Sequence, residues 1–199
     1  MTDGSVLLRA LRRRAVVAGW VAGLVALLGA VPLSAQAAGP ADLAESVDLG
    51  QQVPDTKAIN EGLFPEDACK ELVQAGFKCM GFKPAVRFSL PAASFKLGSA
   101  DLPDLLRQQL DKFAEVLRGK RGSPRVVRIE GHADATGTDD INQSLSQKRA
   151  EAVKDYLIKS GADQAMLQAV GMGAKAPKVS NDPFAAENRR VEIGRQPGS

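Results

Sequence analysis

The residues best suited to bind a ligand lie on, and just before, a helical segment in the C-terminal half of the chain. One face of that segment takes every fourth residue from 145 to 157, namely Leu145, Arg149, Val153 and Leu157. An arginine on an otherwise apolar face needs a counter-charge and hydrogen bonds, because desolvation of a guanidinium is costly. Asp134, fifteen positions earlier, is the acidic candidate. The alternative is that the stem of Arg149 packs while its head reaches solvent.

The residue types needed for catalysis are sparse. His132 is the single histidine, and as a catalytic base it would need a nucleophile or a metal nearby. No paired carboxylates and no Ser/His/Lys set stand at a recognisable spacing. Gly171-Met-Gly173 lacks the third glycine of a dinucleotide site, and one His with two Cys is too few for a zinc site. We therefore expect a binding protein without cofactor or metal, rather than an enzyme.

The first 37 residues have the composition of an export signal. Arginines at positions 9 and 12–14 precede an apolar run over 15–33, and Ala35-Gln-Ala37 offers a cleavage site. Cleavage would leave a chain that begins at Ala38. The alternative is an uncleaved inner-membrane anchor, because the nineteen residues of the run nearly reach the ~20 that span a bilayer. Both interpretations place the rest of the chain outside the cytoplasm.

The basic surplus of the chain belongs to this leader. The formal net charge is +3, and four arginines against one aspartate in residues 1–37 account for all of it. Residues 38–199 are therefore neutral. Phosphate binding needs clustered excess lysine and arginine, so nucleic acid is not the expected partner.

Residues 38–84 form a separate segment in this interpretation, a linker followed by a short helix over 65–75 that ends at Gly76. Cys69 and Cys79 flank the end of this helix. An even cysteine count in an exported chain predicts a disulfide between them, and two buried free thiols are the alternative. The disulfide would staple a segment with little core of its own.

Regular elements follow from residue 85 onward. Alternation over 86–90 and an apolar run over 126–130 predict strands, and shorter strands are expected at 167–170 and 190–193. Helical spacing predicts helices over 102–117 and 145–160, the second opened by a capping box from Ser144 to Gln147. Alternating strands and helices predict an α/β (α+β) sandwich, with helices packed on a small mixed sheet.

Four ordered blocks in this region resemble the OmpA-like C-terminal domain. The central block runs from Gly131-His-Ala-Asp-Ala-Thr-Gly137 through Asn142 to Arg149-Ala150 and Tyr156-Leu157. Phe95-Lys-Leu-Gly-Ser-Ala-Asp-Leu102 resembles the opening block of the family, and two blocks resemble its closing elements: Gly171-Met-Gly173 with Pro177, and Asn188-Arg-Arg-Val-Glu-Ile193. The resemblance covers about residues 85–194 and implies a βαβαβ fold, with a tail at 195–199.

The resemblance also implies a function and a site. It implies a non-catalytic peptidoglycan-binding domain of the Gram-negative periplasm, associated with the cell wall or the outer membrane. In the family, the residues at the positions of Asp134 and Arg149 hold the diaminopimelate side chain of the stem peptide, and Asn142 matches a polar position near the ligand. An aspartate suits the ammonium of diaminopimelate and an arginine suits its carboxylate. Arg189 and Arg190 match the closing block, where we expect a structural role.

Three positions depart from the family pattern without removing these residues. Ala133 replaces a threonine, Ile141 replaces an aromatic residue and Lys96 replaces an aspartate. The ligand preference can differ accordingly. Two functions follow as hypotheses. The first is a tether between the envelope and the wall. The second is an assembly or interaction protein, in which residues 38–84 bind another envelope protein and the OmpA-like domain only localises it.

Overall fold

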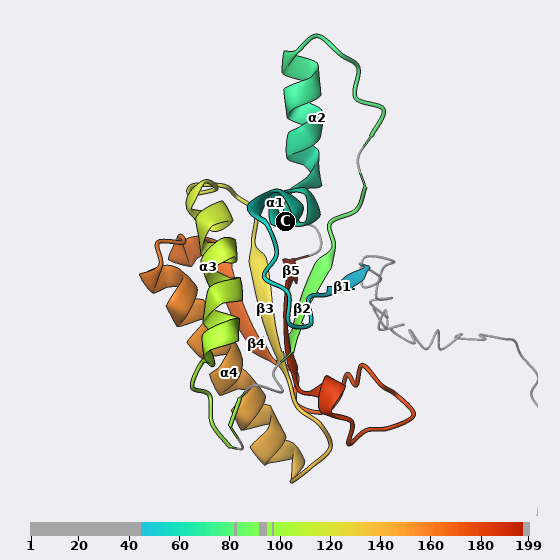
Figure 1. Cartoon of the computed structure of the whole chain (residues 1–199), viewed down its shortest axis with the longest axis vertical. Helices are drawn as coiled ribbons and strands as arrows, with labels where there is room; N and C mark the ends of the chain where they lie inside the picture. Colours follow the sequence, from blue (N-terminus) through green and yellow to red (C-terminus); the bar gives the residue numbers. More distant parts are fainter. Residues whose placement is uncertain (1–44, 82, 92–94, 97, 197–199) are drawn as a thin grey trace, which may run out of the picture. The chain divides into compact units, whose positions relative to one another are not determined.

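A five-stranded mixed sheet organises the part of the chain that the computed structural model describes, residues 45–81, 83–91, 95–96 and 98–196 (Figure 1). The spatial order is β1-β2-β5-β3-β4. β5 runs antiparallel to both of its neighbours, whereas β1 is parallel to β2 and β3 is parallel to β4. The strands are β1 (Ser46–Asp48), β2 (Arg87–Pro91), β3 (Val127–His132), β4 (Leu167–Gly171) and β5 (Arg190–Arg195).

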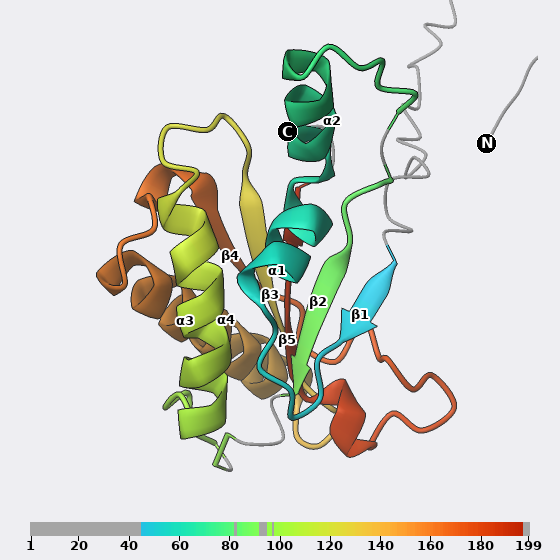
Figure 2. The same cartoon turned by 45° about the horizontal axis from the view of Figure 1, so that its top comes forward.

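The chain has four α-helices in its described part, of which α1, α3 and α4 cover one face of this sheet. The helices are α1 (Thr56–Leu63), α2 (Pro65–Gln74), α3 (Asp104–Arg118) and α4 (Asp139–Lys159), with short 3-10 turns at Gln164–Met166 and Ala186–Asn188. α3 and α4 lie side by side against the sheet (Figures 1 and 2). Their apolar faces meet the inward residues of the strands, and Phe88 and Phe113 contact edge to face in the resulting core. The mixed α/β class predicted from the sequence is therefore confirmed.

α4 begins six residues earlier than predicted. Its N-cap is Thr138, whose hydroxyl accepts a hydrogen bond from the Ile141 amide at 3.3 Å. Asp139 and Asp140 occupy the first turn, where their charge complements the helix dipole. The proposed capping box at Ser144 is wrong, because Ser144 lies inside the helix. The first turns are mostly polar, so apolar spacing alone did not reveal them.

The segment before residue 85 is not separate from the domain. β1 extends the sheet, and Ile59 and Leu63 of α1 are fully buried in the same core as α3. Gly62 also lies against Phe88, since an added Cβ would come within 2.5 Å of its ring. The expected boundary at residue 84 therefore does not divide the packing, and residues 46–64 complete the domain. Neither β1 nor α1 was predicted.

α2 matches the predicted short helix. It ends at Gln74 with Ala75 as its C-cap, and Gly76 follows with a φ of 85°. Cys69 and Cys79 form the predicted disulfide, which joins α2 to the loop after it.

The predicted export signal, residues 1–37, and the linker that begins at Ala38 lie outside the described residues. Among the helices that are described, none combines the length and the apolar character needed to cross a membrane.

Candidate functional site

A cavity of about 480 Å³ opens between the loop after β3 and the first half of α4. The three predicted ligand residues, Asp134, Asn142 and Arg149, all line it. They come from positions up to fifteen residues apart, and the turn between β3 and α4 brings them together. The other lining residues are Phe95, Gly98, Ala133, Thr136, Ile141, Leu145 and Arg189.

Asp134 is held in place at the cavity wall. Its Oδ1 accepts a hydrogen bond from the Thr136 amide at 3.0 Å, and its Oδ2 accepts one from Arg189 Nη1 at 2.6 Å. Burial alone would raise the pKa of this carboxyl group. The hydrogen bonds from Arg189 and Thr136 outweigh burial and hold the pKa of Asp134 below its ordinary value. Asp134 is therefore ionised at neutral pH.

Arg149 is buried, with only 3% of its surface exposed. Its Nε donates to the carbonyl oxygen of Ser99 at 3.1 Å, and its guanidinium lies 4.8 Å from the centre of the Phe95 ring. The guanidinium of Arg149 therefore does not extend into solvent. The alternative prediction, in which only the stem of Arg149 packs and its head reaches solvent, is wrong. Burial lowers the pKa of Arg149, the nearby Arg189 lowers it further, and Asp134 opposes both effects.

The ion-pair partner of Asp134 differs from the one predicted. Asp134 was expected to be the acidic partner of Arg149, but its direct partner is Arg189 of the segment before β5. Asp134 acts on Arg149 only through their charges across the cavity. Within the described part of the chain, the terminal Nη groups of Arg149 make no hydrogen bond. Arg149 lines the cavity, and its Nη groups have the fork geometry suited to a carboxylate.

Asn142 and Arg149 lie on the same face of α4, because seven residues are close to two helical turns. Asn142 is 4% exposed, whereas Ile141 is 59% exposed at the rim. An aromatic residue at position 141 is the family pattern, so the rim here has an aliphatic side chain in its place.

Two glycines allow α4 to approach the sheet closely enough to form the cavity. A Cβ on Gly131 would lie 2.1 Å from the Ser146 carbonyl oxygen, and a Cβ on Gly171 would lie 2.6 Å from the Gln147 amide nitrogen. The amide of Gly171 also donates to Gln147 Oε1 at 2.6 Å. Glycine at these positions therefore sets the distance between α4 and the ends of β3 and β4, and with it the position of Arg149.

Sequence reasoning missed two residues of the cavity. Arg189 was expected to be structural, yet it both pairs with Asp134 and lines the cavity. Phe95 belongs to the opening family block, which gave it no role, and it provides the ring beneath Arg149. Arg190 is buried and pairs with Glu192 at 2.6 Å, in keeping with a structural role.

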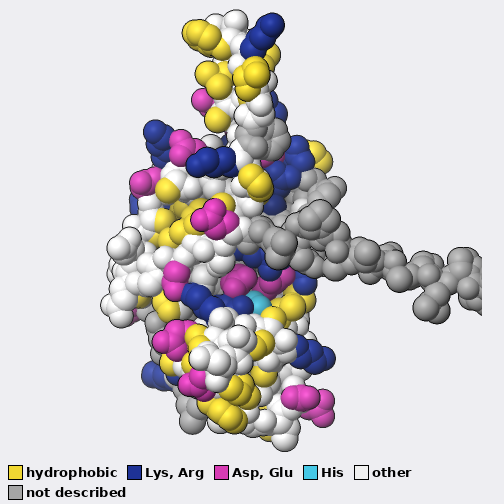
Figure 3. Space-filling view, turned by 90° about the vertical axis from the view of Figure 1, so that its right-hand side faces the viewer, with side chains coloured by type: hydrophobic (Ala, Val, Ile, Leu, Met, Phe, Trp, Pro, Cys, Tyr) yellow, Lys and Arg dark blue, Asp and Glu magenta, His cyan; other side chains and the backbone are white. Residues whose placement is uncertain are grey.

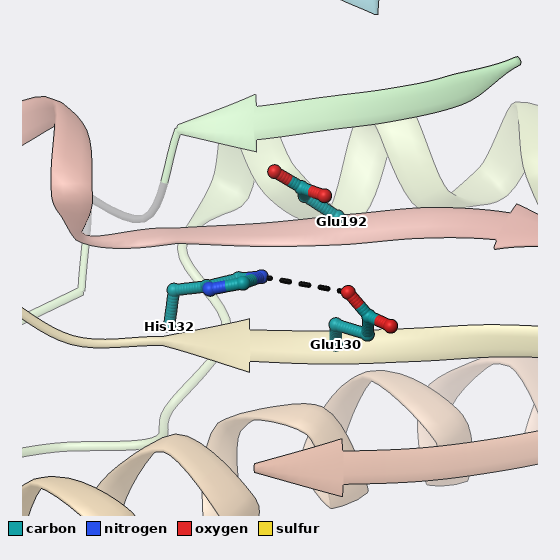
Figure 4. Close-up of side chains that lie close together, drawn as sticks. All are labelled: Glu130, His132 and Glu192. Carbon is teal, nitrogen blue, oxygen red and sulfur yellow. Dashed lines mark ion pairs between the residues drawn. The ribbon is translucent and has the colours of Figure 1, made fainter. Parts of the chain in front are cut away.

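A second group of ionisable residues lies on the sheet face opposite α3 and α4. Glu130, His132 and Glu192 are buried (Figure 4). The carboxylate oxygens and the imidazole nitrogen that could bind a metal ion lie within 4.8 Å of one another. The two carboxylates already pair with arginines, at 2.9 Å from Arg87 to Glu130 and at 2.6 Å from Arg190 to Glu192. A cation placed among them would face these guanidinium charges at close range. The arrangement therefore suits an ion-pair network better than a metal centre.

The fold and the cavity define a ligand-binding domain in which α1, α3 and α4 pack on a mixed sheet and a charged pocket lies at the start of α4. Residues 94–190 match the family model described as the OmpA family, so this part of the chain is an OmpA-like domain.

The chain is similar to envelope proteins of several bacteria. It is 38% identical over 101 residues to the peptidoglycan-associated lipoprotein of Pseudomonas aeruginosa. This match covers 50% of this chain and 58% of that protein. It is 36% identical over 110 residues to outer membrane protein A of Citrobacter freundii, covering 50% and 46%. Each match therefore spans about half of the relative.

A solved structure is also similar, that of the peptidoglycan-associated lipoprotein from Burkholderia pseudomallei. The identity is 32%, the match covers 54% of this chain and 89% of that chain, and the TM-score is 0.48.

Proposed function

We propose that this chain binds peptidoglycan through the diaminopimelate side chain of the stem peptide and so tethers the envelope to the cell wall. The observation that carries the proposal is the shared cavity of Asp134, Asn142 and Arg149, in which an ionised carboxylate and a guanidinium face the same space. The names of the relatives, a peptidoglycan-associated lipoprotein and outer membrane proteins, support the same ligand class and an envelope location.

The charges of the cavity match a zwitterion on one carbon. The free end of diaminopimelate carries an ammonium and a carboxylate. Each carboxylate oxygen of Asp134 has two lone pairs, so it can accept from an ammonium while it keeps its present donor. The Nη groups of Arg149 suit the carboxylate in a bidentate contact. Asn142 adds a neutral donor and acceptor beside them.

The total charge of the cavity favours the acidic end of such a ligand. Asp134 faces two guanidiniums, those of Arg149 and Arg189, so the three residues carry a net charge of +1. Burial and Arg189 both disfavour the charged form of Arg149 in the free protein. A bound ligand carboxylate would offset the unfavourable free energy of keeping Arg149 charged and buried next to Arg189.

The role is one of binding and not of catalysis. His132, the single histidine, lies in the ion-pair network on the other sheet face and does not line this cavity. Export by the leader would place the domain in the periplasm, at the wall or the outer membrane, and an uncleaved leader would hold it at the inner membrane instead. Asp134, Asn142 and Arg149 serve the wall ligand in either case.

The test is binding to purified sacculi together with thermal melting. Asp134→Ala and Arg149→Ala should each weaken binding by roughly 30-fold or more, because loss of one partner of a desolvated charged contact costs ~2–5 kcal/mol. The double variant should be little worse than either single variant, since both residues bind one small group. Walls whose stem peptides carry lysine should bind more weakly.

Two controls remove the same two kinds of charge from exposed positions of α4. Asp155→Ala and Lys148→Ala change residues outside this cavity and should bind as the unmodified chain does. If the site variants melt at a lower temperature yet bind sacculi normally, Asp134 and Arg149 are structural residues and the proposal fails.

The alternative function gives residues 38–84 a protein partner while the domain only localises the chain. The exposed part of α2 supports a role in contacts outside the domain, because it is not used by the core. The exposed part of α2 by itself does not indicate that this contact is a protein.

A further inference from the structure

The disulfide-stapled end of α2 projects from the domain (Figures 1 and 2). We call residues 68–81, the outer part of α2 and the loop to Gly81, the α2 arm. Among the described residues, the ion pairs of this helix with the domain lie at its start, where Glu66 is buried and pairs with Arg195 at 2.7 Å and Asp67 pairs with Lys120 at 2.6 Å. In the arm itself, every residue from Ala68 to Met80 is exposed except the two cysteines, which are half-buried.

The exposed side chains of the arm are largely apolar. Leu72 is 47% exposed, Val73 59%, Phe77 65% and Met80 95%. The amide of Phe77 donates to the Leu72 carbonyl oxygen at 2.9 Å, which places these two residues together at the helix end. Figure 3 shows hydrophobic side chains gathered on the projecting part, with a basic side chain at its end.

The charged residues around these side chains are mostly basic. Lys70, Lys78 and Lys83 are exposed, and Glu71 is the single acid between residues 68 and 83. An apolar tip bordered by lysines matches the interface of an anionic bilayer, in which apolar groups enter the acyl boundary and lysines meet the lipid phosphates.

The size of the arm favours a lipid surface over a protein partner. A stable protein interface takes about 20–30 residues on each side. The arm offers fourteen residues, of which four are large exposed apolar side chains. Shallow insertion to ~5–10 Å needs only a few such side chains. The disulfide supports this use, because it restrains the tip that would otherwise be ordered on binding.

We infer that the α2 arm is a membrane-contact element that inserts Phe77 and Met80 into the interface of an anionic bilayer. This inference does not depend on the wall ligand, since the arm and the cavity are built from different residues.

The test follows an indole placed at the tip. Trp20 is the single tryptophan of the chain and lies in the leader, so Phe77→Trp in a Trp20→Phe background gives a fluorophore specific to the arm. Vesicles containing phosphatidylglycerol should shift its emission to the blue, and brominated lipids should quench it. Vesicles of phosphatidylcholine alone should give a smaller blue shift, and added salt should reduce both the shift and the quenching seen with phosphatidylglycerol.

Partition to the same vesicles, measured by co-sedimentation, provides the matched comparison. Phe77→Ser with Met80→Ser should lower the partition coefficient roughly tenfold or more. Phe184→Ser removes an equally exposed phenylalanine, at 62%, from another loop and should change it little. Lys78→Glu should weaken binding, and Lys175→Glu should not.

Two results would overturn the inference. One is an indole that stays unshifted and unquenched with anionic vesicles, together with unchanged partition of the double variant. The other is a shift that appears only when envelope proteins are present in the vesicles, which would assign the arm to a protein partner. All of the replaced side chains of the arm and of the controls are exposed, so unchanged melting temperatures will show that the variants are folded.

Discussion

Gly131→Ala should destabilise the domain through the contact between β3 and α4. The added methyl group would lie 2.1 Å from the carbonyl oxygen of Ser146 and 2.9 Å from its carbonyl carbon. Both atoms belong to helix backbone, so no rotamer change can relieve the overlap. α4 would have to move away from β3 by about 1 Å, and the packing of Val153 and Leu157 on the same face would loosen with it.

The expected cost lies at the upper end of the range for overpacked cores, about 3 kcal/mol. For a domain of this size, 1 kcal/mol shifts the melting temperature by ~2–4 °C, so a loss of about 6–12 °C is expected. The same displacement carries Arg149 away from Asp134. Binding of sacculi by the folded variant should therefore weaken as well, because ligand contacts tolerate only ~0.5 Å of misplacement.

Differential scanning calorimetry of Gly131→Ala beside Gly119→Ala will decide this. Gly119 has a φ of −69°, and a Cβ there would meet nothing nearer than 3.3 Å, so this control should melt within a few degrees of the unmodified chain. Equal melting temperatures for the two variants would refute the proposed close contact as a determinant of stability.

Three further outcomes are expected. Thr138→Ala should lower the free energy of unfolding by about 1 kcal/mol in urea titrations, because it removes the N-cap of α4; an unchanged midpoint would show that the cap is dispensable. Reduction of the Cys69–Cys79 disulfide should speed amide hydrogen exchange in residues 68–81 and leave α3 and α4 unchanged, since the ring encloses only the arm; uniform acceleration would contradict this. The pKa of Asp134 is depressed in the folded state, so the stability it contributes is complete above pH 3.8 and is lost as the pH falls through the lower folded value. The difference in stability between the unmodified chain and Asp134→Asn should accordingly shrink below about pH 4, and a difference that stays constant down to pH 2 would contradict the pairing with Arg189.

Local patterns in the sequence determined most of the elements and the composition of the site. Apolar spacing located α3 and the main part of α4, the terminal glycine Gly76 marked the end of α2, and alternation located β2, because burial on one face imposes such periods on neighbouring residues. Arg149 on an apolar face indicated a polar pocket, and the nearby loop supplied Asp134 as its acidic member. These elements and residues could be predicted from the sequence because each pattern involves residues within a few helical turns of one another.

The tertiary structure decided the features that depend on distant residues. β1 has three residues and α1 has eight, too few for a clear period, and they join the domain only because β2 and α3 lie beside them. Asp134 takes Arg189, fifty-five positions away, in place of the nearer Arg149. Phe95 reaches Arg149 from a loop before α3. Contacts between residues so far apart are set by how the strands and helices pack, and no local spacing encodes which of several arginines will reach a given carboxylate.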